Sequence, residues 1–155
     1  MASYHFHLTQ VKRSRGQSVI AQAAYRAGEK LYSTYYGESS DFTRKRGVVM
    51  AEICLPDHAP REYADRETLW NALEWAESGR KAQLAHSFDI TLMNEFSMEE
   101  NIEMVRAFVQ EELVSRGMIA DFAIHDPVRP KGAEPNPHIH ILVPIRPLKK
   151  AKIGR

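Results

Sequence analysis

The sequence predicts an α+β fold in which a mainly antiparallel sheet of about five strands carries helices packed on one face. Two observations lead to this prediction. Segments with the two-residue period of half-buried strands alternate with segments that have the 3.6-residue period of amphipathic helices, in the order strand, helix, strand, helix, strand, helix, strand, strand. The loop before the last strand is too short for a helical crossover, so the final two strands should be antiparallel neighbours.

Composition indicates one soluble domain. The 155 residues are 43% apolar and 26% charged, and no internal repeat or linker interrupts them. No apolar run reaches the ~18 residues of a membrane span and no signal peptide opens the chain, so we expect no membrane insertion. The single cysteine, Cys54, excludes a disulfide framework and favours the cytoplasm. The net charge of +1 divides into +5 for residues 1–50, −9 for 51–125 and +5 for 126–155.

The first third of the chain predicts two strands around one helix. Residues 3–11 alternate between apolar and polar side chains, as in a half-buried strand. Residues 17–31 have the spacing of an alanine-rich helix, 32–47 form a polar and aromatic hairpin or loop, and 48–55 form a strand. The expected core-facing residues of the first strand are Tyr4, Phe6 and Leu8. Those of the helix are Ile20, Ala24, Ala27 and Leu31.

Two helices and three strands complete the prediction. Amphipathic helices are expected over 65–79 and 97–117, and strands over 82–92, 118–126 and 138–148. The helix boundaries are indicated by an N-cap, a capping box and two terminating glycines, which are Asp65, Ser97 with Glu100, Gly79 and Gly117.

Histidines on the last two strands predict a metal site. The two-residue strand period places His138 and His140 on one face, with the intervening apolar residues turned into the core. His125 ends the preceding strand and could reach the same face across the hairpin. Three neutral imidazoles from adjacent strands can bind a metal ion and leave positions open for substrate oxygens, although they do not decide which metal.

A simpler interpretation is that these are surface histidines on a solvent-facing strand. H-x-H by itself is also a weak signal for any one activity, since it occurs in many unrelated metalloenzymes. His5 and His7 form a second such pair that could line the same face if the first strand is central. His86 lies on an apolar face and is better explained as a core histidine, and His58 in a loop is given no role.

Tyr25 on the first predicted helix is the second unusual residue. It lies off the core-facing stripe, between the small residues Ala21 and Gly28 on the helical wheel, and Arg26 follows it. An exposed amphipathic tyrosine would have the same pattern. Other tyrosines compete for any special role, namely Tyr32, Tyr35 and Tyr36.

Five stretches together resemble the MobA/MobL relaxases, the nicking domains of mobilisable plasmids, which are related to TraA-type relaxases. They are "GQSVIAQAAYR", "RKRG", "DRETLWNALEWAE…RKAQLAHSFDITL", "GMIADFAIHD" and "NPHIHILVPIRPL". The similarity runs from Tyr4 to Leu148, and the helix tyrosine and both histidine motifs fall in family order.

The resemblance implies an HUH-type endonuclease. Tyr25 would be the nucleophile, and His125, His138 and His140 would hold a divalent cation, usually described as Mn²⁺ or Mg²⁺. The enzyme would nick one DNA strand at an origin of transfer that is locally single-stranded at the nick. It would remain attached through a 5′-phosphotyrosine and later rejoin the strand. Accessory relaxosome proteins and a coupling protein would be its partners.

Basic residues on loops and beside Tyr25 are the expected DNA contacts. They are Lys12, Arg13, Arg15, Arg26, Arg44, Lys45 and Arg46, with Lys149 and Lys150 as weaker candidates.

The chain also departs from its relatives. Many carry an acidic residue where this chain has Ser87, and Asp89 on the same strand face could instead orient a ligand histidine or take the tyrosine proton. The loop between His125 and His138 is longer than in relatives and could alter DNA access. Because family members usually continue into further regions, residues 1–155 are expected to be a single relaxase domain at the N-terminus of a longer protein.

Other functions are compatible with the same residues. One is a phosphodiester hydrolase that uses a metal-bound water, with Tyr25 incidental. Another is a rolling-circle replication initiator with the same chemistry, and a third is a DNA-binding module without enzymatic activity.

Overall fold

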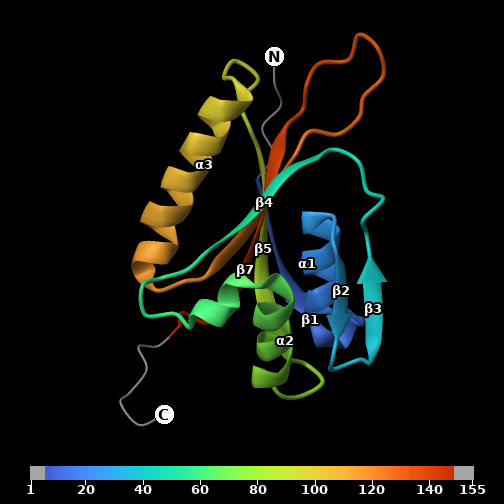
Figure 1. Ribbon diagram of the computed structural model, residues 1–155, viewed down its shortest axis with the longest axis vertical. Coiled ribbons are helices and arrows are strands. Elements are labelled where there is room, and N and C mark those ends of the chain that lie inside the picture. The colour runs from blue at the N-terminus through green and yellow to red at the C-terminus, as the bar shows by residue number, and fades with distance from the viewer. Residues whose placement is uncertain (1–5, 149–155) are drawn as a thin grey trace.

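The computed structural model describes residues 6–148, and its centre is an antiparallel sheet (Figure 1). The strands are β1 (Phe6–Lys12), β2 (Lys30–Ser33), β3 (Glu38–Asp41), β4 (Val48–Cys54), β5 (Gln83–Thr91), β6 (Ala120–His125) and β7 (His138–Pro144). Five of them form the sheet in the order β1-β5-β7-β6-β4, and β2 and β3 form a separate hairpin. The α+β class and the antiparallel pairing of the last two strands are therefore confirmed.

Within residues 6–148, three α-helices accompany the sheet, and they are α1 (Val19–Ala27), α2 (Arg66–Ala76) and α3 (Met98–Glu112). The side chain of Asp65 accepts a hydrogen bond from the Thr68 N–H, and Ser97 and Glu100 form a reciprocal capping box, as predicted. Each such cap stabilises a helix by about 1 kcal/mol. None of the helices in the described range is long and apolar enough to cross a membrane.

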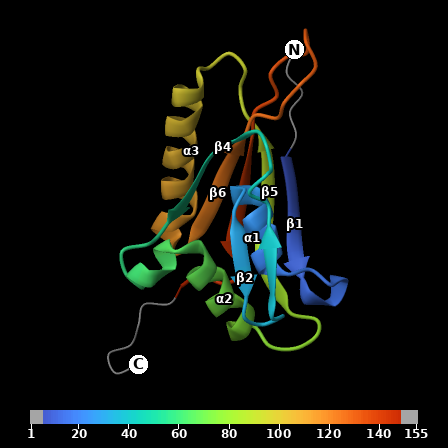
Figure 2. The same cartoon turned by 45° about the vertical axis from the view of Figure 1, so that its right-hand side comes forward.

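The helices cover both faces of the sheet, which corrects the expectation that they share one face. α1, α2 and the β2–β3 hairpin lie on one side, and α3 lies on the other (Figure 2). Alternation along β7 explains the difference, because Leu142 joins the core under α1 and α2 while its neighbours join the core under α3. Those neighbours are Ile139, Ile141 and Val143. A sheet with apolar side chains on both faces needs cover on both.

The prediction of a helix through residue 31 is wrong. α1 ends at Ala27, and Gly28 adopts a left-handed conformation with φ of 67°. A Cβ at Gly28 would also lie 3.2 Å from Cγ2 of Val48, so both the turn and the close approach favour glycine. Leu31 consequently lies in β2, where its side chain is buried.

The predicted core face of the first strand is also wrong. Among the described strands, β1 pairs only with β5 and forms an edge of the sheet. Phe6 is 64% exposed and Leu8 is 51% exposed, and only Val11 of this strand is buried. Alternation alone does not show whether a helix extends over the edge of a sheet, and here α3 covers the central strands. Tyr4 lies outside the described residues.

A buried ion pair fixes α2 to the sheet. Arg66 on α2 donates from Nε and Nη2 to the two carboxylate oxygens of Asp121 on β6, each at 2.8 Å. The Trp70 indole donates to the same carboxylate at 2.8 Å, and Arg66 also reaches Glu29 just after α1. This network sets the position of α1 relative to β6, and it thereby sets the position of the residues described next.

Candidate metal and nucleophile site

Three histidines meet where β6 and β7 pair. His125 lies opposite His138 in the register of the two strands, and His140 follows two residues later on the same face. The ring centroids lie 4.3 to 5.7 Å apart. One nitrogen of each ring can be chosen so that all three lie within 4.8 Å of one another. The predicted convergence of three imidazoles is therefore confirmed.

Each ring is oriented by an oxygen that can only accept a hydrogen bond. These oxygens are Asp89 Oδ1, 2.5 Å from His140 Nδ1; Asn136 O, 3.0 Å from His138 Nδ1; and Arg26 O, 2.7 Å from His125 Nε2. A neutral ring must therefore carry its proton on the nitrogen that faces this oxygen. The opposite nitrogen then presents a lone pair, which is the form in which imidazole binds a metal.

The charges of the site suit a cation. Burial, with smaller contributions from His140 and Lys45, lowers the pKa of His125 to about 4, so this ring is neutral at pH 7. Burial acts to raise the pKa of Asp89, but the hydrogen bond and charge of His140 and the charge of Arg26 prevail and hold it below its usual value. Nitrogen donors favour a transition-metal ion over Mg²⁺, which prefers oxygen.

Tyr25 lies in the last turn of α1. The carbonyl of the next residue, Arg26, accepts the hydrogen bond from His125, so the backbone beside Tyr25 contacts the histidine cluster. The Tyr25 side chain is 45% exposed and its ring packs edge-on against Phe42, with 5.3 Å between centroids. The Lys45 ammonium lies 3.5 Å from the ring centroid. Core packing does not explain an exposed phenol in this position.

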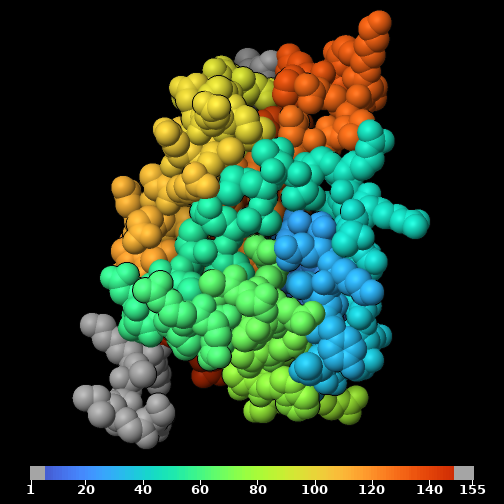
Figure 3. Space-filling model, in the orientation of Figure 1, coloured from blue at the N-terminus to red at the C-terminus, as the bar shows by residue number. Residues whose placement is uncertain are grey.

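A close approach at Gly47 holds the basic segment 44–46 beside the histidines. Asp126 N donates to Gly47 O at 2.8 Å. A Cβ at Gly47, whose φ is 86°, would lie 3.0 Å from the Asp126 carbonyl oxygen. The loop over 126–137 continues from this contact and projects from the body of the molecule (Figure 3).

Arg26, predicted to contact DNA, is turned inward. Its Nη2 donates to Ser87 Oγ on β5 at 2.5 Å, and its Nη1 donates to Gln22 Oε1 at 2.6 Å. Burial lowers the pKa of this guanidinium, while the charge of Asp89 opposes the change. Arg26 therefore joins α1 to β5 next to the site, and Ser87 is its acceptor.

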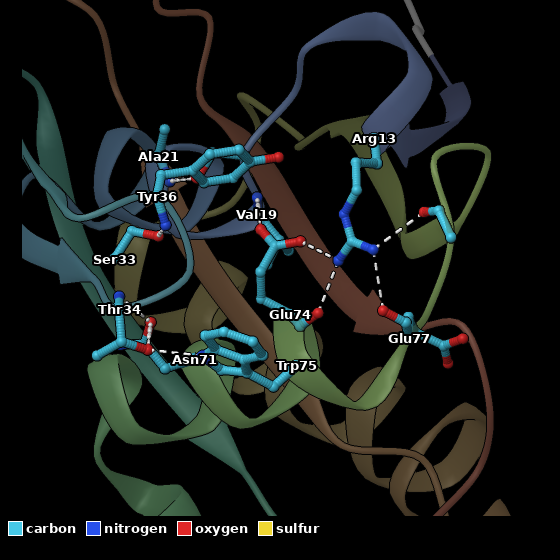
Figure 4. A network of polar contacts seen from close by, with 12 residues as sticks. Arg13, Val19, Ala21, Ser33, Thr34, Tyr36, Asn71, Glu74, Trp75 and Glu77 are labelled. Atoms are coloured by element: carbon cyan, nitrogen blue, oxygen red, sulfur yellow. Dashed lines mark hydrogen bonds and ion pairs between the residues drawn. The ribbon is translucent and has the colours of Figure 1, made fainter.

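Arg13, also predicted to contact DNA, has partners inside the protein (Figure 4). Its Nη2 lies 2.6 Å from Glu74 Oε2, and the side chains of the two residues are 8% and 0% exposed. The guanidinium also donates to the carbonyl oxygen of Glu74 in the last turn of α2 and to those of Glu77 and Gly79 beyond its end. A guanidinium with these partners is not available to a phosphate.

The remaining basic candidates differ in exposure. Lys12 is half-buried at the end of β1, and Lys45 is half-buried against Tyr25. Arg15, Arg44 and Arg46 are exposed and have no ion-pair partner among residues 6–148. Lys149 and Lys150 lie outside the described part of the chain.

The other histidines of the described residues do not join the three-ring cluster. His7 is exposed on β1, in register with Asp89 on β5. His86 is half-buried beside Phe88, and His58 Nε2 lies 2.8 Å from the Leu148 carbonyl oxygen. His5 falls outside the described residues. The tyrosines that rival Tyr25 belong to β2 and to the hairpin turn after it, and they are Tyr32, Tyr35 and Tyr36.

Two contributors to the site were missed because they are backbone carbonyls. The Arg26 carbonyl has no signature in the sequence, since any residue could supply it. The Asn136 carbonyl had a usable signal, because Pro137 restricts the preceding residue to an extended conformation and so limits where its carbonyl can point. Ser87 was noted as a departure from relatives, but its contact with Arg26 spans 61 positions and could not be read from the chain.

Similar proteins identify the family. Conjugal transfer protein TraA of Rhizobium radiobacter is 37% identical over 164 residues, which cover 99% of this chain and 14% of TraA. Probable mobilization protein MobA of Bifidobacterium longum is 36% identical over 143 residues, which cover 92% of this chain and 25% of MobA. The chain thus spans a quarter or less of the length of these two relatives.

A solved structure has the same fold. A chain from "Molecular Basis of Vancomycin Resistance Transfer in Staphylococcus aureus" superposes with a TM-score of 0.85 and 33% identity, covering 99% of this chain and 79% of that one. The model of the MobA/MobL family matches residues 17–155. The chain belongs to the MobA/MobL family.

Proposed function

We propose that the chain nicks and rejoins one DNA strand at an origin of transfer, with Tyr25 as the nucleophile and a 5′-phosphotyrosine as the intermediate. The observation that carries the proposal is the hydrogen bond between His125 and the Arg26 carbonyl, which joins the backbone beside Tyr25 to the three-histidine cluster. Membership of the MobA/MobL family, and relatives named for conjugal transfer and mobilization, support DNA as the substrate.

The proposed step is an in-line displacement at the scissile phosphodiester. The Tyr25 hydroxyl oxygen attacks the phosphorus and releases its proton to solvent, while the bond from phosphorus to the 3′ oxygen breaks. The upstream strand leaves as a protonated 3′-hydroxyl, and the 5′-phosphate of the downstream strand remains on Tyr25. Attack by the 3′-hydroxyl reverses the step, and no nucleotide is consumed because the phosphotyrosine retains the bond energy.

His125, His138 and His140 would hold a divalent cation, and their nitrogen donors fit Mn²⁺ better than Mg²⁺. When bound, the cation would polarise the phosphoryl oxygens and neutralise the charge that develops during displacement. We assign Asp89 to orienting the His140 ring, because a carboxyl group whose pKa is held low is a poor acceptor for the tyrosine proton.

The residues around Tyr25 would position the strand. Lys45 lies on the Tyr25 ring, and the exposed side chains of Arg44 and Arg46 flank it, so their charges can meet phosphates on either side of the scissile bond. The strand must be single-stranded there for its phosphate to reach the phenol. Accessory relaxosome proteins and a coupling protein would deliver such a strand.

The proposal is tested by incubating the chain with a labelled single strand of cognate origin DNA and Mn²⁺. We expect a protein–DNA adduct that survives denaturant, is absent with chelator and is absent in Tyr25→Phe. Tyr32→Phe is the matched control, since Tyr32 is equally exposed at 46% but lies on β2, and this variant should form the adduct normally.

The same assay separates the alternative of a metal-dependent hydrolase. Such an enzyme would release a free 5′-phosphate strand without an adduct and would remain active as Tyr25→Phe. That result would exclude Tyr25 as the nucleophile, while leaving the histidine cluster as the metal site.

A further inference from the structure

A cleft lies at the opposite end of α1 from Tyr25. Its volume is about 650 Å³, and it opens between the turn that follows β1, the tip of the β2–β3 hairpin and the loop that precedes β5. The residues that matter in it are two tyrosines and three cations, namely Tyr35, Tyr36, Arg13, Arg80 and Lys81. Neither the histidine cluster nor Tyr25 contributes to this cleft.

The aromatic wall of the cleft is held rigidly. The Arg13 guanidinium lies 4.4 Å from the centroid of the Tyr35 ring. The same guanidinium is held by the Glu74 carboxylate (Figure 4). Tyr35 packs edge-on against both Tyr36 and Trp75, with 4.9 Å between centroids in each pair. Tyr36 is 39% exposed, so this braced cluster presents part of an aromatic side chain to solvent.

The other wall carries free positive charge. Arg80 and Lys81 are exposed and have no ion-pair or hydrogen-bond partner among residues 6–148. Some other exposed arginines are paired, for example Arg106 with Glu52 and Arg146 with Glu77. The carboxylate of Glu74 does not neutralise Arg80 and Lys81, because it is buried and engaged by Arg13.

We propose that this cleft binds an unstacked base of single-stranded DNA against Tyr36, with the adjoining phosphates held by Arg80 and Lys81. Exposed aromatic rings beside unpaired cations are the chemistry by which proteins hold single strands, because every base has a π-face and every nucleotide a phosphate. The proposal rests on the proposed function, since the bound strand is the one whose scissile phosphate lies at Tyr25.

The surface of α1 offers a path between the two sites. Tyr25, Ala21 and Ser18 are separated by four and three residues and so lie along one side of the helix. This row is about 10 Å long at the helical rise of ~1.5 Å per residue. The side chains of Ala21 and Ser18 are small, so a strand that leaves Tyr25 can follow the helix to the cleft. The cleft would therefore hold a base a few nucleotides from the nick.

The test measures equilibrium binding in a Tyr25→Phe background, so that covalent chemistry cannot contribute. The probe is fluorescently labelled oligo(dT) of about 16 nucleotides, a length within the range that single-strand binding modules cover. We expect Tyr36→Leu to weaken binding by about 5- to 150-fold, whereas Tyr36→Phe, which keeps the ring, should bind like the parent. The thermal midpoint of each variant checks that it is folded.

The charges are tested by the salt dependence of binding. The double variant Arg80→Gln, Lys81→Gln should reduce the slope of log affinity against log salt by about 1.4, the value for two lost phosphate contacts on a single strand. Arg61→Gln with Arg116→Gln removes the same charge from exposed residues outside the cleft and should leave the slope within experimental error. Duplex DNA of the same length should bind the Tyr36→Leu variant and the parent equally.

Unchanged affinity in Tyr36→Leu, or equal losses on single-stranded and duplex DNA, would overturn the proposal. This failure is distinguishable from failure of the nicking mechanism. A chain that forms the Tyr25 adduct but binds oligo(dT) independently of Tyr36 would refute the cleft alone. A chain that forms no adduct but needs Tyr36 for binding would refute the mechanism alone.

Discussion

Two tyrosines near opposite ends of α1 each carry a cation on the ring, yet the two pairs differ in what surrounds them. At the C-terminal end, the Lys45 ammonium lies 3.5 Å from the Tyr25 centroid, in a half-exposed setting without a carboxylate partner among residues 6–148. At the other end, the Arg13 guanidinium lies 4.4 Å from the Tyr35 centroid and is paired with buried Glu74.

The difference shows that the role of a cation on a tyrosine ring depends on whether a carboxylate also pairs with it. Arg13 is neutralised by Glu74 and also donates to carbonyl oxygens in and just beyond the last turn of α2, so its contribution is to stability. Lys45 keeps its charge available beside an exposed phenol and the histidine cluster. Both cations come from short basic segments that look equivalent in the sequence, and each half of the comparison can be tested separately.

The largest expected effect is on stability at the Arg13 end. Arg13→Leu leaves the Glu74 carboxylate buried without its partner and should reduce the free energy of unfolding by about 3–5 kcal/mol. The double variant Arg13→Leu, Glu74→Leu should recover part of this loss, because no unpaired charge remains. Urea denaturation measures both values.

The neighbour Arg15 provides the matched control. It is exposed and unpaired within the described range, so Arg15→Leu should change the free energy of unfolding by less than about 0.5 kcal/mol. If Arg13→Leu were as mild as Arg15→Leu, the structural role assigned to Arg13 would be wrong.

The next effect is a pH dependence at the histidine end. The folded-state pKa of His125, about 4, lies below its ordinary value of 6.5, so the unfolded chain takes up a proton first as the pH falls. In the metal-free protein, the contribution of His125 to the free energy of unfolding should therefore be fully present above pH 6.5. It should decline between pH 6.5 and 4, by no more than about 3 kcal/mol in total.

Urea denaturation at a series of pH values measures this dependence, and His125→Gln should lack the decline. Asp89 contributes in a different window, because its lowered pKa means that its stabilisation is lost as the pH falls below 3.8. A His125→Gln profile identical to that of the parent between pH 6.5 and 4 would show that another group is responsible.

A smaller effect is expected from the carboxylate behind the cluster. Asp89→Asn removes the charge that fixes His140, and loss of such an orienting partner weakens metal binding by about 10- to 100-fold. Calorimetric titration with Mn²⁺ measures the change. Asp57→Asn is the control, since Asp57 is exposed and outside the cluster. Equal Mn²⁺ affinity in Asp89→Asn and the parent would show that Asp89 does not orient His140 for metal binding.

The smallest effect belongs to Lys45. Lys45→Ala should reduce the free energy of unfolding and weaken the binding of origin DNA by about 0.5–1 kcal/mol each. This is the usual size of an exposed cation–π or phosphate contact. Lys45→Arg keeps the charge and should restore DNA binding. A loss of several kcal/mol in the free energy of unfolding of Lys45→Ala would mean that Lys45, like Arg13, mainly stabilises the fold.

Local signals in the sequence predicted much of the fold. The alternation along β7 and the capping box at Ser97 act over a few residues, and both were confirmed. The end of α1 was missed because Leu31 continues the apolar helical spacing of Ala24 and Ala27, although α1 ends at the left-handed Gly28, which also closely approaches Val48. The exposure of Phe6 depends on which strand lies at the edge of the sheet, and that is a property of the whole topology.

In the candidate site, too, some features follow from local sequence signals and others depend on tertiary contacts. His138 and His140 lie on one strand and His125 on its hairpin partner, so their convergence follows from strand geometry. The partner of Arg13 lies 61 positions away on α2, and nothing near Arg13 in the chain distinguishes it from Arg15. A basic residue can be found in a sequence, but whether its charge is free is decided by tertiary contacts.

The central claim is that Tyr25 is the residue that becomes joined to DNA. The most direct measurement is tandem mass spectrometry of the chain after reaction with single-stranded origin DNA and Mn²⁺, followed by nuclease and protease digestion. We predict a nucleotide phosphate on the peptide that contains Tyr25 and on that residue. The same modification on Tyr32, Tyr35 or Tyr36, or cleavage with no modified tyrosine, would contradict the account.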